Sequence, residues 1–204
     1  MEKFIRLTAT ACPLELAIVD TDQLLPARFL KLSRSEGLGK FLFHDIRRDA
    51  QGNEQAGFPL NQPVWRESKI IVGGASFGVG SSREAAVYAL YDSGIRCVIA
   101  ASFGDIFAQN SVKNGLLPAA LGASDLAELS DTLKRNPEFA VTVDLEMQTI
   151  TCGNRSFEFS IAPSWREQLL NGWDEIDLTR SHQAEIDAFR QQRQQAAPWV
   201  FPNR

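Results

Sequence analysis

The stretch that decides the fold is residues 69–101, which read KIIVGGASFGVGSSREAAVYALYDSGIRCVIAA. A short β-branched run at 69–73 leads into a segment of small residues, and the apolar residues at 81–93 are spaced as in a helix. A second apolar run follows at 96–101 and is typical of a buried strand. This order of strand, loop, helix and strand predicts a layered α/β fold.

The sequence on either side of this unit continues the alternation. The predicted elements are strands at 5–11, 15–19 and 116–121 and helices at 103–113, 124–135, 163–170 and 182–194. Residues 139–144 and 155–159 alternate apolar with polar side chains on either side of a turn at Cys152-Gly153-Asn154, which is typical of antiparallel strands. We therefore predict a mixed sheet.

Composition narrows the class of protein. With 204 residues, 44% hydrophobic and 23% charged, we predict a single domain over residues 1–204 with a C-terminal helical extension from about residue 180. The formal charge of -4 and the lack of a Lys/Arg run predict no nucleic-acid partner. No segment has the apolar length of a signal peptide core or a membrane span, so we expect a cytoplasmic protein without a membrane partner.

The cysteines and histidines offer little for a metal site. Cys12, Cys97 and Cys152 lie far apart and form no CxxC pair, which argues against both a disulfide framework and a self-contained metal site. We interpret them as small buried hydrophobes. His44 and His182 are the only histidines, so a histidine triad or zinc site has almost no material. We predict no metal ligands in this chain.

The glycine-rich segment at 73–84 is the candidate ligand site, because small residues let the backbone approach a ligand closely. Ser81 and Glu84 have the spacing of a capping box, which by itself would explain both residues without a ligand. That box predicts that Ser82 and Arg83 lie in the first helical turn, at the positive end of the helix dipole. An arginine at that position favours an anionic guest, a carboxylate or a phosphate.

The better-known motifs of this kind are absent. A GxGxxG fingerprint would need glycine where Arg83 stands, and a Walker A loop would need Lys followed by Ser or Thr where Ser81 and Ser82 stand. A Gly-x-Ser-x-Gly nucleophile elbow is also missing. The segment therefore points to an anion site of another type.

Four blocks in the same order resemble one protein family. Residues 78–84 (GVGSSRE) resemble the GxGSSRE signature of the swivelling domain of the aconitase superfamily. Residues 20–30 (DTDQLLPARFL) resemble the DTDxIIPARFL segment of isopropylmalate isomerase small subunits. Two further blocks of that family are similar to residues 101–118 (ASFGDIF, then NGLLP) and 170–176 (LNGWDEI). Together these matches span most of the chain.

This resemblance implies a three-layer β/β/α swivelling domain with a mixed sheet, which docks on a separate large subunit as a heterodimer or heterotetramer. That partner would carry a [4Fe-4S] cluster, and this chain would bind no cofactor. The implied activity is the isomerisation of 2- and 3-isopropylmalate by dehydration and rehydration in leucine biosynthesis. The apolar terminal segment at 196–202 would pack on the large subunit or fold back on its own domain.

The resemblance also implies roles for individual residues. The family's catalytic serine base corresponds to Ser81, which we expect to take the proton next to the hydroxyl-bearing carbon. Ser82 would hydrogen-bond the substrate, and Arg83 would hold a substrate carboxylate. Asp22 matches an acidic active-site position in aconitases, although an Asx-turn or a cap would explain it equally well. Arg34 falls in the specificity loop, where the alternative is a solvated basic residue at a helix end.

Departures from the family pattern keep other functions open. Val79 stands where cysteine is common, Ala85 where histidine is common, and residues 33–37 read SRSEG where many relatives have Arg-Thr-Gly. One alternative is a paralogous hydro-lyase subunit for another 2-hydroxy diacid, such as dimethylmalate, citramalate or a homocitrate-like acid. Another is an anion-binding module without catalysis.

Overall fold

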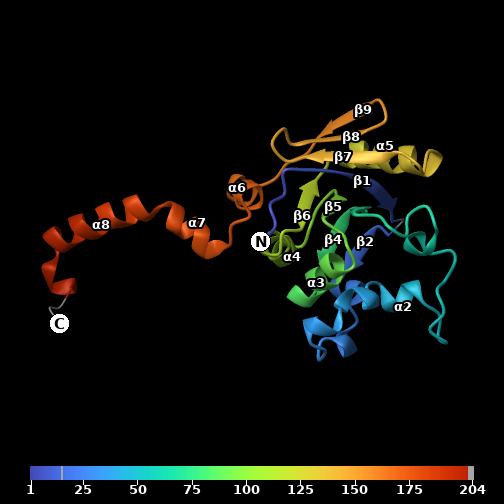
Figure 1. Ribbon diagram of the computed structural model, residues 1–204, viewed down its shortest axis with the longest axis horizontal. Helices are drawn as coiled ribbons and strands as arrows, with labels where there is room; N and C mark the ends of the chain where they lie inside the picture. Colours follow the sequence, from blue (N-terminus) through green and yellow to red (C-terminus); the bar gives the residue numbers. More distant parts are fainter. Residues whose placement is uncertain (15, 202–204) are drawn as a thin grey trace.

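The computed structural model describes residues 1–14 and 16–201 (Figure 1). Its strands are β1 (Arg6–Pro13), β2 (Ile18–Asp20), β3 (Ile70–Val72), β4 (Ser76–Val79), β5 (Cys97–Ala100), β6 (Leu117–Ala120), β7 (Ala140–Asp144), β8 (Thr149–Cys152) and β9 (Arg155–Glu158). Its α-helices are α1 (Thr21–Leu24), α2 (His44–Arg47), α3 (Glu84–Asp92), α4 (Asp105–Lys113), α5 (Ala123–Arg135), α6 (Pro163–Asn171), α7 (Glu175–Ser181) and α8 (Gln183–Ala196). Short 3-10 helices lie at Ala27–Phe29, Arg34–Glu36, Leu38–Phe41, Pro59–Asn61 and Pro198–Val200.

Within the described residues, seven strands form one mixed sheet in the order β6-β5-β3-β1-β7-β8-β9. The strands from β6 to β1 are parallel, and those from β1 to β9 are antiparallel. β1 belongs to both halves, because Thr10 pairs with Ala140 of β7 while Ala11 pairs with Ile70 of β3. The predicted α/β class and mixed sheet are confirmed. The sequence prediction missed β8, a four-residue strand between the two predicted antiparallel ones.

Two hydrophobic cores lie on opposite faces of the parallel strands. On β3, Ile70 and Val72 face a core shared with α5 and the strands β7 to β9, whereas Ile71 faces a core shared with α3. This alternation follows from the two-residue period of a strand that is buried on both faces. The antiparallel half, together with α5, therefore covers one face and α3 covers the other, which gives the predicted β/β/α layers (Figure 1).

A second, two-stranded sheet leads into the candidate site. β2 and β4 pair in parallel, with Ile18 opposite Ser76 and Val19 opposite Phe77. We did not predict β4, because it lies inside the glycine-rich segment and its small residues give no apolar period. The strand predicted at 15–19 is shorter in the structure, and its first residue, Glu15, lies outside the described residues. The chain thus passes through two strands, β3 and β4, before it reaches α3.

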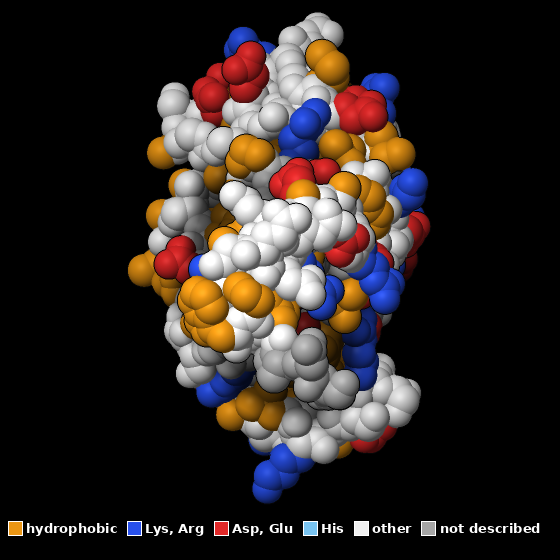
Figure 2. Space-filling view, turned by 90° about the vertical axis from the view of Figure 1, so that its left-hand side faces the viewer, with side chains coloured by type: hydrophobic (Ala, Val, Ile, Leu, Met, Phe, Trp, Pro, Cys, Tyr) orange, Lys and Arg blue, Asp and Glu red, His pale blue; other side chains and the backbone are white. Residues whose placement is uncertain are grey.

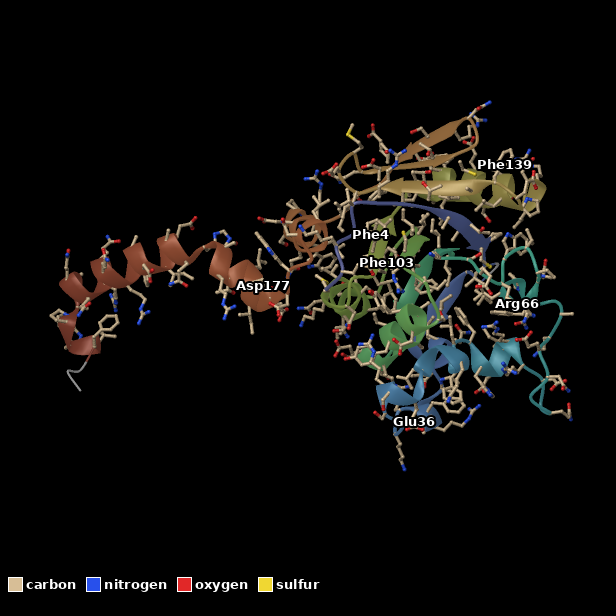
Figure 3. All side chains as sticks on the ribbon, viewed as in Figure 1. Phe4, Glu36, Arg66, Phe103, Phe139 and Asp177 are labelled. Atoms are coloured by element: carbon tan, nitrogen blue, oxygen red, sulfur yellow. The ribbon has the colours of Figure 1, made fainter. Side chains whose placement is uncertain are left out.

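The C-terminal arm, residues 175–201, projects from the body that carries the sheet (Figure 1). It consists of α7, α8 and the terminal 3-10 helix, and Asp177 marks its first part in Figure 3. Large apolar side chains on it face solvent, with Phe189 66% and Trp199 77% exposed. An ion pair of 3.0 Å between Lys113 Nζ and Glu175 Oε1 connects the start of the arm to α4. No helix in the described part of the chain is long and apolar enough to cross a membrane.

Candidate active site

Two glycines, one within β4 and one directly after it, shape the chain that leads from β4 to α3. Gly78 and Gly80 have φ angles of 71° and 99°, in the left-handed region that favours glycine. A Cβ built on Gly78 would lie 2.0 Å from Cγ of Phe107, so a larger residue could not keep this position. The loop can therefore lie directly against the N-terminal part of α4. We call residues 80–83 the site loop.

The predicted capping box is wrong. Helix α3 begins at Glu84, and Arg83 occupies the N-cap position with an extended backbone and no side-chain cap. Ser82 and Arg83 are therefore outside the first helical turn. The Glu84 carboxylate instead accepts a hydrogen bond of 2.8 Å from Asn114 Nδ2. Tertiary contacts decide this outcome, because a capping box requires the serine next to the helix and the fold holds Ser81 elsewhere.

Helix α1 fixes the site loop from the other side. Thr21 Oγ1 donates a hydrogen bond of 2.9 Å to the Ser81 carbonyl oxygen. Asp20 caps α1 in a capping box with Gln23, so the cap proposed as one explanation of Asp22 belongs to Asp20. Asp22 forms an ion pair with Arg83, whose side chain is 20% exposed. The aspartate and the arginine, 61 positions apart in the sequence, thus meet across the loop.

A cavity of about 270 Å³ opens beside the site loop. Its lining residues are Thr21, Gly78, Val79, Gly80, Ser81, Arg83, Gly104, Asp105, Ile106 and Phe107. Ser81 and Arg83 therefore share one cavity. Asp22 does not line the cavity but forms the ion pair with Arg83. Ser82 lies between Ser81 and Arg83 in the chain, is exposed, and does not line the cavity. Asp105, at the start of α4, is a lining residue that the sequence prediction missed. Its place in the ASFGDIF block was the available signal.

Arg34 lies at the other end of α3 and does not line this cavity. Its Nη2 is 3.1 Å from Asp92 Oδ1, and its guanidinium carbon is 4.1 Å from the ring centre of Tyr88. Burial and the negative charge of the nearby Glu84 carboxylate raise the pKa of Tyr88. Arg34 is therefore paired with α3, while its side chain is 43% exposed. Tyr88 connects it to Glu84, the residue after Arg83.

The three cysteines are free and buried, as we interpreted them from the sequence. Burial raises the pKa of the Cys12 thiol to about 12 and also raises the pKa of Cys97. Among the described residues, no group of three His, Cys, Asp or Glu side chains could hold a metal ion. The donors of this part of the chain thus do not fit an iron–sulfur cluster, whose iron atoms need several thiolates close together.

The arrangement combines a solvent-facing hydroxyl with a fixed positive charge. The ion pair with Asp22 involves Arg83 Nη1, so other N–H groups of the guanidinium stay available for a carboxylate in the cavity. Ser81 lines the same cavity within two residues of that charge. Such a site can bind a small carboxylic acid and exchange a proton with it.

Comparisons with known proteins find similar proteins along nearly the whole chain. The family model described as the aconitase C-terminal domain matches residues 1–124, and the model described as LeuD_N matches residues 127–163. The 3-isopropylmalate dehydratase small subunit of Dinoroseobacter shibae is 48% identical over 98% of this chain and 100% of its own length. The protein of that name from Paracoccus denitrificans is 46% identical, with the same two coverages.

A solved structure supports the fold. The crystal structure of 3-isopropylmalate dehydratase from Methanocaldococcus jannaschii superposes with a TM-score of 0.63 and covers 90% of this chain and 99% of its own. Its sequence identity to this chain is 23%, so the likeness concerns the fold alone.

Proposed function

This chain belongs to the aconitase C-terminal domain family and, within it, to the 3-isopropylmalate dehydratase small subunits, and from this we propose that it is the small subunit of such a dehydratase. The enzyme is a hydro-lyase that works with a large subunit. We further propose that the large subunit carries the [4Fe-4S] cluster, that the two form a heterodimer or heterotetramer, and that the complex acts in the cytoplasm in leucine biosynthesis.

The proposed reaction is a dehydration followed by a rehydration. A proton leaves the carbon next to the hydroxyl-bearing carbon, the hydroxyl leaves as water, and water then adds to the double bond with hydroxyl and proton exchanged. The cluster of the partner subunit supplies Lewis-acid chemistry at the departing hydroxyl. The residues of this chain have to hold the carboxylate end of the acid and move the proton.

The observation that carries the proposal is the shared cavity of Ser81 and Arg83. We assign Ser81 as the base, Arg83 as the ligand of a substrate carboxylate, and Ser82 as a hydrogen-bond partner. A serine is a weak base unless its alkoxide is stabilised, and Arg83, which lines the same cavity, provides positive charge nearby. Asp22 orients Arg83 through its ion pair.

The experiment that tests this function combines the chain with a cluster-bearing large subunit. Absorbance of the unsaturated intermediate reports dehydration of 3-isopropylmalate. Ser81→Ala removes the proposed base, so kcat should fall by about 10²- to 10⁴-fold while the complex still assembles. Ser156→Ala, at an exposed serine of β9, serves as the matched control and should keep full activity.

Two results would count against these assignments. Full activity of Ser81→Ala would show that Ser81 is not the base. Binding of carboxylic acids without turnover, in every partner complex tried, would favour the anion-binding module. A panel with dimethylmalate, citramalate and homocitrate distinguishes the remaining substrates, and Arg34→Gln should change the preference within that panel if Arg34 contacts the variable side of the acid.

A further inference from the structure

A second pocket, which we call the basic pocket, lies where the parallel strands begin. It has a volume of about 240 Å³, and its lining residues are Glu2, Lys3, Phe4, Ile5, Arg6, Leu7, Lys69, Arg96 and Gly115. Lys69 directly precedes β3 and Arg96 directly precedes β5, and these two strands pair in parallel. The site loop follows the other ends of β3 and β4, so the two pockets lie at opposite ends of the sheet strands.

The N-terminal segment builds one wall of this pocket. Its terminal amino group donates a hydrogen bond of 2.9 Å to the Gly172 carbonyl, and the Phe4 amide donates one of 2.9 Å to the Leu169 carbonyl. Both acceptors belong to the end of α6, beside which Phe4 lies (Figure 3). The Phe4 side chain is 7% exposed and packs in the core. The wall is therefore anchored rather than loose.

Arg96 is the preorganised cation of the pocket. Its Nη1 donates hydrogen bonds of 2.8 Å and 3.0 Å to the carbonyls of Tyr91 and Ile95. Its guanidinium carbon lies 3.7 Å from the ring centre of Tyr91, a stacking contact that fixes the plane of the group. Because a guanidinium carries five N–H groups, donors on Nε and Nη2 remain for a ligand.

The balance of charge in the basic pocket is positive. Four cations line it, Lys3, Arg6, Lys69 and Arg96, against the carboxylate of Glu2. Asp144 lies 4.0 Å from Arg6 Nε and offsets part of one charge. The ammonium groups of Lys3 and Lys69 have no ion-pair or hydrogen-bond partner among the described residues. This positive cluster stands out in a chain with a net charge of -4.

We propose that the basic pocket binds a small, multiply charged oxyanion, either a phosphate or a polycarboxylate. Arg96 holds the anion through charge-assisted hydrogen bonds, and Lys69 and Lys3 add charge from the rim. The volume accommodates a small molecule and excludes a folded protein segment. An anion bound there contacts the starts of β1, β3 and β5 together, so it stabilises the parallel half of the sheet.

The test is a residue-resolved titration of the isolated full-length chain. Inorganic phosphate, citrate and potassium chloride are added separately at matched ionic strength, and amide chemical shifts are followed by NMR. We expect saturable shifts at Lys69, Arg96 and Gly115 with phosphate or citrate but not with chloride. The anion that saturates the shifts at the lower concentration, phosphate or citrate, shows which of the two classes of oxyanion the pocket prefers. Shifts at the site loop in the same spectra report separately on binding near Arg83.

Substitutions decide whether the pocket side chains do the binding. Lys69→Gln should raise the Kd of the anion by about two- to fivefold, as for an exposed charge pair. Arg96→Gln should raise it by about tenfold. Lys31→Gln and Arg190→Gln remove matched charges from exposed positions elsewhere and should change nothing. Lys69 is exposed, so its variant keeps the test valid even if loss of the Arg96–Tyr91 stack impairs folding.

Equal shifts with chloride would overturn the proposal, because they would show only ionic-strength effects. Unchanged binding in both Lys69→Gln and Arg96→Gln would also overturn it. The absence of saturable shifts with both phosphate and citrate likewise contradicts a small-anion site. None of these outcomes depends on the activity proposed for the site loop.

Discussion

Gly78 shows how one residue can set the position of a candidate active site. Its positive φ and its contact with the Phe107 ring are two separate demands, and only glycine meets both. The sequence marked the segment as glycine-rich without showing which glycine is irreplaceable. That depended on Phe107, which lies 29 positions further along the chain.

The Gly78→Ala variant separates these two demands when it is compared with Gly52→Ala. Gly52 also has a positive φ, 84°, but a Cβ there meets nothing within 4 Å. Gly52→Ala should therefore lower the free energy of unfolding by about 1–2 kcal/mol from backbone strain alone. Gly78→Ala should lower it further, by about another 1–3 kcal/mol from overpacking against Phe107. Equal losses in denaturant unfolding would contradict the packing argument.

Asp45 makes a pH-dependent contribution to the free energy of unfolding. The hydrogen bond with Arg28 lowers the pKa of Asp45 to about 2, below the usual value of about 3.9 in unfolded chains. A lowered pKa means that the contribution is complete above about pH 5 and is lost as the pH falls toward 2. Both side chains are about half exposed, so it amounts to at most about 1 kcal/mol.

The measurement compares the free energy of unfolding of the natural chain and of Asp45→Asn between pH 7 and pH 3. The difference between the two should shrink as the pH falls. Arg28→Gln should show the same trend, because it removes the other partner of the same pair. A difference that stays constant over this range would mean that Asp45 titrates normally.

At the scale of elements, α3 connects the site loop to Arg34. Glu84, Tyr88 and Asp92 recur every four residues and therefore lie on one face of the helix. Glu84 accepts a hydrogen bond from Asn114 near the site loop. The Tyr88 ring stacks on the guanidinium of Arg34, and Asp92 forms an ion pair with Arg34. The sequence predicted the helix but began it three residues too early, because local capping preferences do not include the bond from Thr21 to Ser81.

Tyr88 variants test this connection, given the proposed role of Arg34 in substrate choice. Tyr88→Leu removes the ring under the guanidinium, so KM for the acid should rise by about two- to fivefold with kcat little changed. Tyr88→Phe keeps the ring under the guanidinium and loses only the hydroxyl, so its KM should stay close to that of the natural chain. Steady-state kinetics of the complex measure both constants, and identical KM values in the two variants would exclude the stacking role.

At the scale of the whole molecule, the C-terminal arm lies apart from the body. Figure 2, viewed from the side on which the arm lies, shows exposed hydrophobic side chains among polar ones. The terminal helix Pro198–Val200 does not fold back on the sheet, which was one of the two expectations for the apolar end (Figure 1). Isolated helices of this length are marginal in water, so packing against a partner would stabilise the arm.

Removal of residues 182–204 tests the arm without disturbing the Lys113–Glu175 ion pair. The free energy of unfolding of the isolated chain should change by less than about 0.5 kcal/mol, because the side chains of α8 are largely exposed. Assembly with the large subunit, followed by analytical ultracentrifugation, should weaken. Phe189→Ser and Trp199→Ser each remove a single exposed apolar side chain of the arm and should weaken assembly less than the truncation does. Unchanged assembly of the shortened chain would show that the arm is not part of the interface.

The sequence by itself determined the alternation of strands and helices, the mixed sheet and the family, because these follow from local periodicity and from motifs along the chain. It also placed Ser81, Ser82 and Arg83 in one segment. Only the tertiary structure decided that Asp22 pairs with Arg83, that Asp105 lines the same cavity and that Arg34 lies at the far end of α3. Such contacts join residues tens of positions apart, and their geometry depends on how whole elements pack rather than on any local preference of the chain.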